Sequence, residues 1–252
     1  MTREDALIHY LFRLGDNALI LAQRLSELVA AGPELEEELA IANFALDYLG
    51  QARMYYSMAC ELEGDGRSED DIAFLRSERE FENLVLLEQP NGHFGDTIVR
   101  QVLFDSHYLL QLETLKDCGD PGLAGIAARA HKEILYHLRH ASQWLIRLGD
   151  GTDESRARMQ ESLRRLWRYT GEMFAGDAVD DVVRDEFDGP DLAKIETRWR
   201  ASLQPLLATA TLAMPGDQWM HGGGRQGLHT EHFGYLLAKM QYLQRSFPGS
   251  RW

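Results

Sequence analysis

Residues 3–29 read REDALIHYLFRLGDNALILAQRLSELV, and the spacing of their apolar side chains decides the fold class. Apolar residues recur there in alternating steps of four and three: Leu7, Leu11, Leu14, Ala18, Leu21, Leu25 and Leu28. Because an α-helix completes a turn in about 3.6 residues, this spacing places them on one side of a single long helix. Such a side must pack against other elements, so the stretch predicts a helical bundle.

The rest of the chain shows the same period between short breaks rich in glycine and proline. We expect core helices at about 3–29, 33–63, 96–118 and 121–148, and accessory helices at about 153–174, 191–214 and 230–245. Asp96 is the predicted N-cap of the third helix, the acidic stretch 177–188 a loop or frayed turn, and Pro205 a kink or split. Four long helices with short connections indicate an all-α, antiparallel four-helix bundle with additional helices, in one domain over 1–252.

Charge and composition narrow the classes of partner. The formal net charge is −14 at pH 7, so the phosphates of nucleic acid or of an anionic membrane would meet like charge. No stretch approaches the roughly 20 apolar residues of a membrane helix, and the charged amino terminus lacks the apolar core of a secretory signal. Cys60 and Cys118 lie in no metal-binding spacing and are expected to be reduced thiols. These features predict a cytoplasmic protein that binds neither nucleic acid nor membrane.

Polar side chains interrupt the predicted core faces of three helices. Asp105 and His137 occupy core positions of the third and fourth helices, and Asp47 and Gln51 form a polar stripe along the second. The core face of that second helix is predicted to contain Leu39, Ala42, Leu46, Leu49, Tyr56 and Cys60. A buried ionisable group is costly unless it is paired or hydrogen-bonded. We therefore expect Asp47, Gln51, Asp105 and His137 to meet inside the bundle.

A di-iron centre would be one explanation of this polar cluster. Bundles that hold two irons use a Glu from each of two helices and a Glu-x-x-His pair from each of the other two. No Glu or Asp of this chain is followed three residues later by His, and the first helix has no carboxylate on its apolar side. A hydrogen-bond network without metal is therefore favoured. The alternative is an atypical di-iron site formed by Glu133, His137, Asp105 and Asp47.

Three further groups of residues are weaker indications of a functional site. A basic, aromatic patch is either a solvated helix face or a contact with another protein chain: Arg164, Arg165, Trp167 and Arg168. The cluster 229–232, with two histidines and a glutamate, is best explained as a helix cap with solvated neighbours. The Gly-rich loop 222–227 lacks the residue order of a phosphate-binding loop and is predicted to be mobile or to contact a partner.

Several long segments resemble one protein family. They are RLGDNALILAQRLSE (13–27), ALDYLGQAR (45–53), LLEQPNGHFGDTIVRQ (86–101), KEILYHLRHA (132–141), LWRYTGEMF (166–174) and GLHTEHFGYLLAKMQYLQR (227–245). Over essentially its whole length the chain is similar to the C-type subunits of bacterial phenylacetyl-CoA epoxidase, the multicomponent monooxygenase of aerobic phenylacetate degradation. The resemblance implies a ferritin-like fold and a catalytic partner, the A-type subunit, which carries the di-iron centre and binds the CoA ester. It also implies association with the B-type subunit and with a reductase that delivers electrons.

The resemblance further implies that the metal ligands have been lost. In the catalytic subunits, the Glu and His of a KEExFH segment and of a DExGH segment bind iron. Here KEILYH keeps His137 but has Ile134 in place of the ligand Glu, and Tyr48 and Gln51 replace the Glu and His of the other segment. A non-ligand Asp and a carboxylate of a third ligand helix are matched by Asp47 and Asp105. The cluster thus resembles a vestigial metal site.

These observations lead to one main hypothesis and two alternatives. The main hypothesis is a structural, non-catalytic component without a cofactor of its own, which pairs with the di-iron catalytic subunit and stabilises it. The alternatives are a di-iron oxygenase or oxidase in its own right and a free-standing helical binding protein. Homodimerisation, and contact between the loop 222–227 and CoA, are left open by the sequence.

Overall fold

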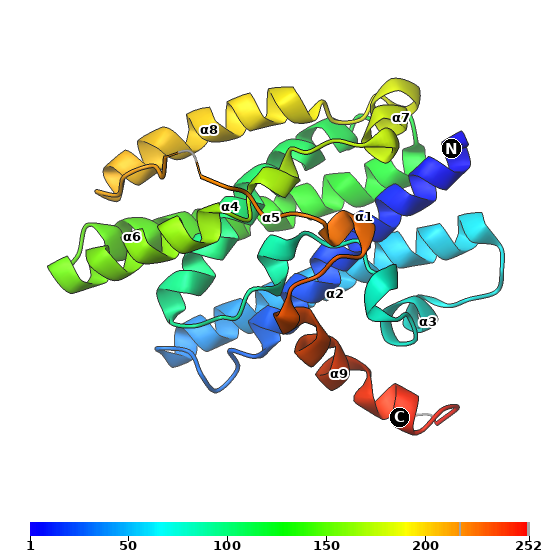
Figure 1. Ribbon diagram of the computed structural model, residues 1–252, viewed down its shortest axis with the longest axis horizontal. Coiled ribbons are helices and arrows are strands. Elements are labelled where there is room, and N and C mark those ends of the chain that lie inside the picture. Colours follow the sequence, from blue (N-terminus) through cyan, green and yellow to red (C-terminus); the bar gives the residue numbers. More distant parts are fainter. Residues whose placement is uncertain (217, 251–252) are drawn as a thin grey trace. The chain divides into compact units, whose positions relative to one another are not determined.

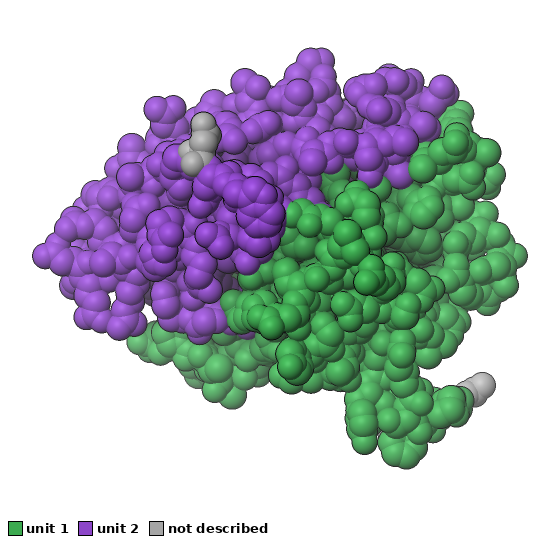
Figure 2. Space-filling view, in the orientation of Figure 1, with its two compact units in different colours: residues 1–90, 222–252 green, residues 91–221 purple. Residues whose placement is uncertain are grey.

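The computed structural model describes residues 1–216 and 218–250, and within these residues it contains nine α-helices and no strand. The chain forms two compact units (Figure 2). Unit 1 comprises residues 1–90 and 222–252, and unit 2 comprises residues 91–221. The prediction of an all-α fold is confirmed, and that of a single domain over 1–252 stays a prediction. No described helix is long and apolar enough to cross a membrane.

Unit 1 is built on two long helices, α1 (Arg3–Ser26) and α2 (Leu35–Glu63), which pack against each other. Thr2 and Asp5 form a capping box that fixes the start of α1. All the apolar positions predicted to face the core are buried, from Leu7 to Leu28. A Cβ atom on Gly15 would lie 2.5 Å from the ring of Tyr56, so the glycine allows this close approach of α1 and α2. The predicted core face of the first helix is therefore confirmed.

The predicted core face of the second helix is wrong for Leu39 and Leu46 and confirmed for Tyr56. Leu39 and Leu46 are 58% and 64% exposed, while the buried face of α2 consists of Ile41, Phe44, Ala45, Tyr48, Gln51, Ala52, Tyr55, Tyr56 and Ala59. Two apolar stripes run along this helix, and both have helical spacing. The wider stripe, with its large aromatic residues, buries more area and faces the core.

The remainder of unit 1 covers these two helices with short elements. They are α3 (Glu69–Phe74), the 3-10 turns Glu78–Glu80, Val85–Glu88 and Gly224–Gln226, and α9 (Glu231–Ser246). The C-terminal helix α9 packs on α3 and on the first two of these turns (Figure 1). The amide of Gln241 donates hydrogen bonds to the carbonyl oxygens of Ala73 and Arg76, which joins the two sequence segments of unit 1.

Unit 2 is organised around α4 (Phe94–Leu115), which packs against α5 (Pro121–Gly149), α6 (Asp153–Trp167) and α8 (Leu192–Thr209). Every residue from 95 to 108 is buried, although several of them are polar. By contrast, α5 buries about one residue in each turn, including Ala130, Ile134, His137 and Ala141. The helix α4 is therefore the central helix of this unit.

Three local predictions in unit 2 are corrected by the structure. The N-cap of α4 is His93, and Asp96 is instead the third helical residue, whose side chain completes a capping box. The stretch expected to be a loop forms α7 (Ala178–Phe187), because Asp177 caps it and its apolar residues at spacing four, such as Val179 and Val183, are buried. Pro205 lies inside an uninterrupted α8 and does not split it.

Candidate functional site

The four residues predicted to form a polar cluster lie in the two units, two in each. Gln51, Asp105 and His137 are completely buried, whereas Asp47 is half-buried. Asp47 and Gln51 belong to α2 of unit 1, and Asp105 and His137 to α4 and α5 of unit 2. Within unit 2, the Gln101 amide donates a 3.2 Å hydrogen bond to Asp105 Oδ2. The predicted burial is thus confirmed for three of these side chains, and their meeting in one network stays a prediction.

The side chains at the ligand positions do not suit a di-iron centre. Tyr48 and Gln51 stand one helical turn apart on α2, Ile134 and His137 one turn apart on α5, and all four are fully buried. Of these, only His137 is an ordinary ligand of iron in such bundles, which depend on carboxylates. Glu133 forms an ion pair with Arg129, at 3.1 Å on the same helix. Residues 1–216 and 218–250 contain no group of three or more His, Cys, Asp or Glu side chains placed to hold a metal.

A buried ion pair in unit 1 was missed by sequence reasoning. Asp16 on α1 is completely buried and accepts hydrogen bonds from the guanidinium of Arg76, from the Tyr56 hydroxyl at 2.5 Å and from the backbone N–H of Glu82 at 2.7 Å. The guanidinium also lies over the ring of Phe81, 4.1 Å from its centroid. The first helix therefore does bury a carboxylate, although off the predicted apolar stripe.

Within this network, the pKa of Tyr56 and the pKa of Arg76 are both raised. Burial and the negative charge of Asp16 raise the pKa of Tyr56 well above its usual value, so its hydroxyl remains a donor. Burial alone would lower the pKa of Arg76, but the charge of Asp16 outweighs it and the pKa is raised. With donors and acceptors satisfied, the network is a structural clamp that ties α1 and α2 to the segment after α3.

A second buried network in unit 1 is centred on Glu88. One carboxylate oxygen accepts hydrogen bonds from the Thr230 N–H at 2.8 Å and from the Thr230 hydroxyl at 2.7 Å, and so caps the N-terminus of α9. The other oxygen accepts from Asn83 at 3.0 Å and lies 2.6 Å from His229 Nδ1. The expectation of solvated neighbours at residues 229–232 is wrong for His229, whose side chain is fully buried.

The surroundings of His229 favour its protonated form. Its Nδ1 faces Glu88, and its Nε2 lies 3.0 Å from the carbonyl oxygen of Phe81. Both neighbours are acceptors, so only the imidazolium, with a proton on each nitrogen, satisfies both. Burial lowers the pKa of His229, but the hydrogen bond and charge of Glu88 and the Phe81 carbonyl outweigh it, and the pKa is raised.

The raised pKa of His229 predicts a pH-dependent stability. A group whose pKa is higher in the folded state stabilises that state fully below its unfolded pKa of about 6.5, and the effect is lost as pH rises through the folded pKa. We expect the urea midpoint of the wild type to fall between pH 6 and pH 8.5, and His229→Gln to show a flatter profile. His9, whose pKa is raised by its hydrogen bond to Glu82, needs a parallel His9→Gln control. A wild-type midpoint that rises over this range would contradict the prediction.

The Gly-rich loop of unit 1 is closely packed. Gly224 and Gly227 are buried, and a Cβ atom would lie 2.1 Å from the Asn83 carbonyl oxygen at the first and 2.3 Å from the Arg79 carbonyl oxygen at the second. Gly227 also has a φ of +70°, which favours glycine. These two glycines allow backbone segments to touch, which anchors the loop at Gly224 and Gly227, and contact of the loop with a partner stays a prediction.

The tryptophan of the predicted basic patch is not on the surface. Trp167 is 1% exposed, and its ring stacks on that of Trp199 with 5.3 Å between centroids. Leu163 and Leu166 are buried beside it on α6, so Trp167 completes an apolar face with spacing of three and four. Trp167 is thus a core residue of unit 2, and its assignment to a surface patch is wrong.

Two arginines of that patch, Arg164 and Arg165, form ion pairs within unit 2. Arg164, whose side chain is 60% exposed, pairs with Glu161, and the backbone carbonyl of the half-buried Arg168 accepts from the His221 N–H. Arg165 lies 2.5 Å from the buried carboxylate of Asp96. Burial would raise the pKa of Asp96, but hydrogen bonds from Ser162 and Arg165 lower it, so this pair fastens α6 to the start of α4. Contact of the exposed arginines with another protein chain stays a prediction.

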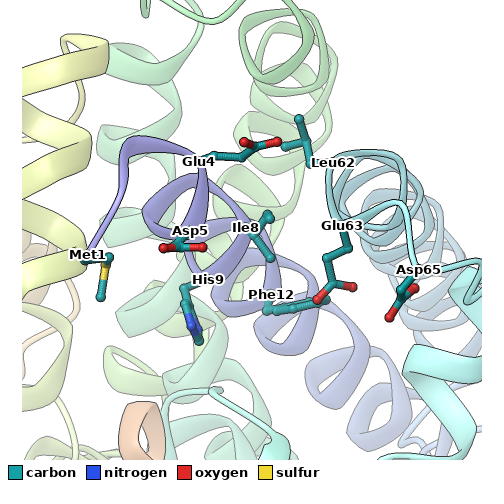
Figure 3. A pocket seen from close by; sticks show the side chains of 9 residues that line it. All are labelled: Met1, Glu4, Asp5, Ile8, His9, Phe12, Leu62, Glu63 and Asp65. Atoms are coloured by element: carbon teal, nitrogen blue, oxygen red, sulfur yellow. The ribbon is translucent and has the colours of Figure 1, made fainter.

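A pocket in unit 1 has a volume of about 770 Å³ and lies between the first turns of α1 and the end of α2 (Figure 3). Four of its titratable side chains serve local structure. Asp5 caps α1, His9 pairs with Glu82, and Glu63 and Asp65 both bind Arg67. This pocket therefore lacks the nucleophile and the poised acid–base pair of a catalytic site.

Comparison with known proteins gives relatives of the whole chain. The family described as Phenylacetic acid catabolic protein matches residues 1–252. The chain is 48% identical over 248 residues to the C-type subunit of 1,2-phenylacetyl-CoA epoxidase from Escherichia coli (strain K12), and the match covers 98% of this chain and 100% of that protein. The resemblance found in the sequence is confirmed, and the all-α architecture agrees with the ferritin-like fold expected of these proteins. The chain therefore belongs to the phenylacetic acid catabolic protein family.

Proposed function

We propose that this chain is a structural, non-catalytic component of a multicomponent phenylacetyl-CoA epoxidase. In this role it pairs with the di-iron catalytic subunit and stabilises it in the cytoplasm, in a complex with a further protein of the B type and a reductase. The relative with 48% identity is named as one of the subunits of that epoxidase, which supports membership of such a complex. The catalytic step then belongs to the partner, which holds the iron.

The observation that carries the non-catalytic role is the identity of the buried side chains on α2 and α5. Tyr48, Gln51 and Ile134 are completely buried where the catalytic subunits have Glu, His and Glu. A phenol, an amide and an alkyl group at these positions leave His137 without the carboxylates that a di-iron site requires. Asp105, one of the polar groups that remain, accepts a hydrogen bond from the Gln101 amide.

The experiment that tests the proposal measures metal and activity together. The purified chain is incubated with ferrous iron, dialysed and analysed for metal, and we expect far less than one iron per chain. The catalytic subunit is then assayed with its reductase in the presence and absence of this chain. We expect phenylacetyl-CoA-dependent oxygen uptake only when both are present. Retention of about two irons per chain, or turnover by this chain without its catalytic partner, would overturn the proposal.

A further inference from the structure

A second apolar stripe on α2 is open to solvent. Leu35, Leu39 and Leu46 are 67%, 58% and 64% exposed, and the half-buried Ala42 and Leu49 complete steps of four, three, four and three. We call these residues the outer face of α2. From Leu35 to Leu49 the face spans about 21 Å at 1.5 Å per residue. Exposed leucines arranged in one continuous row are uncommon on a monomer and mark an interaction surface.

This face is not required by the core of unit 1. The opposite side of α2 carries the large buried residues, such as Phe44 and Tyr48, and α2 packs on α1. The spacing of the outer face is that of a seam between two packed helices. Beside the seam, a Cβ atom on Gly50 would meet nothing within 4 Å, so a neighbouring backbone can approach closely there. The geometry therefore fits another helix.

The negative charge along the outer face of α2 determines which kind of partner helix fits it. Residues 35–49, over which the outer face runs, contain four carboxylates (Glu36, Glu37, Glu38 and Asp47) and no Lys or Arg, which gives a net charge of −4. A second copy of this face would bring another −4 against it, and like charges across an interface disfavour pairing. A helix with leucine-type side chains flanked by Lys and Arg fits both the seam and its charge.

We infer that the outer face of α2 docks a basic, amphipathic helix of the di-iron catalytic subunit. This inference rests on the proposed function, because it names the surface used by that partner. The two leucines at the middle of the face, Leu39 and Leu46, are the expected apolar anchors. Glu36 and Asp47 beside them supply the attraction to the partner's basic residues.

The test measures affinity between this chain and the purified catalytic subunit by calorimetry. We expect Leu39→Glu/Leu46→Glu to weaken binding roughly 100-fold, since each change places a charge in an apolar seam. The matched control is Leu135→Glu/Tyr136→Glu on α5, where the residues are 53% and 61% exposed, and its affinity should stay within about threefold of the wild type. Because all four residues are exposed, the melting temperature should be unchanged in both variants.

A second variant tests whether the carboxylates beside the outer face contribute to binding. The outcomes below distinguish a failure of the proposed function from a failure of this inference. We expect Glu36→Lys/Asp47→Lys to weaken binding, and added salt to weaken the wild-type complex. If the wild-type chain does not bind its catalytic partner in any condition, the proposed function fails. If it binds and Leu39→Glu/Leu46→Glu binds equally well, only this inference is overturned. The inference is also overturned if the isolated chain sediments as a dimer and Leu39→Glu/Leu46→Glu sediments as a monomer. In that case the outer face of α2 would bind a second copy of this chain.

Discussion

Replacing Arg76 by Met lowers the free energy of unfolding by about 3–5 kcal/mol, because the carboxylate of Asp16 is left buried without a cation. Asp16 is completely buried and Arg76 is 5% exposed, so water does not replace the lost guanidinium. The Tyr56 hydroxyl and the Glu82 N–H still donate to the carboxylate, but neither carries charge. Chemical unfolding in urea, followed by circular dichroism, measures the loss.

The control for Arg76 is an exposed ion pair. Arg184 on α7 pairs with Asp181 and Asp185 at the surface, and Arg184→Met should leave the unfolding midpoint as in the wild type. Adding Asp16→Asn to the Arg76→Met variant removes the stranded charge and should restore part of the stability. Equal losses in Arg76→Met and Arg184→Met would show that the buried network is not the clamp described above.

Replacing Trp199 by Ala should cost unit 2 about 3–5 kcal/mol of stability, the usual range for loss of a buried aromatic side chain. Trp199 on α8 is fully buried, stacks on Trp167, and donates its indole N–H to the Leu103 carbonyl oxygen and to the Ser106 hydroxyl at 3.1 and 2.8 Å. The substitution removes the contact that fastens α8 to α4 and leaves a cavity. Thermal and urea unfolding measure the effect.

Two further variants separate packing from hydrogen bonding at this position. Trp199→Phe keeps much of the ring stacking and loses the indole donor, so we expect a smaller loss of about 1–2 kcal/mol. Trp219→Ala is the matched control, because Trp219 is 73% exposed and its removal should change the melting temperature little. A Trp199→Ala variant as stable as Trp219→Ala would contradict the role assigned to the ring.

The helices were predictable because periodicity and capping are local. The core helix predicted at about 121–148 is observed as Pro121–Gly149, and Pro121 at the first helical position and Asp120 at the cap mark its start. The face of α2 was not predictable, because two apolar stripes satisfied the same period and only tertiary packing chooses between them. The acidic residues of 177–188 obscured the buried valines of α7 in the same way.

The residues of the candidate site were likewise predictable where the evidence is local and not where it depends on tertiary contacts. Asp105 and His137 were predicted to be buried because they interrupt apolar faces, and they are. Asp16 and Glu88 were missed because their partners, Arg76 and His229, lie 60 and 141 residues away, and no spacing rule connects such pairs. Trp167 was misplaced because the arginines around it dominate the local composition, although the leucines before it mark a core face.

The discontinuity of unit 1 has a consequence for biosynthesis. Its first 90 residues leave the ribosome long before residues 222–252, which supply the helix capped by Glu88. At about 5–20 residues per second, translation of the intervening segment takes on the order of ten seconds. During that delay Glu88 has neither Thr230 nor His229, whereas residues 91–221 already contain every residue of their own unit. We therefore expect the later segment to fold first, while the nascent amino-terminal helices wait for the carboxyl terminus as natural clients of a ribosome-associated chaperone.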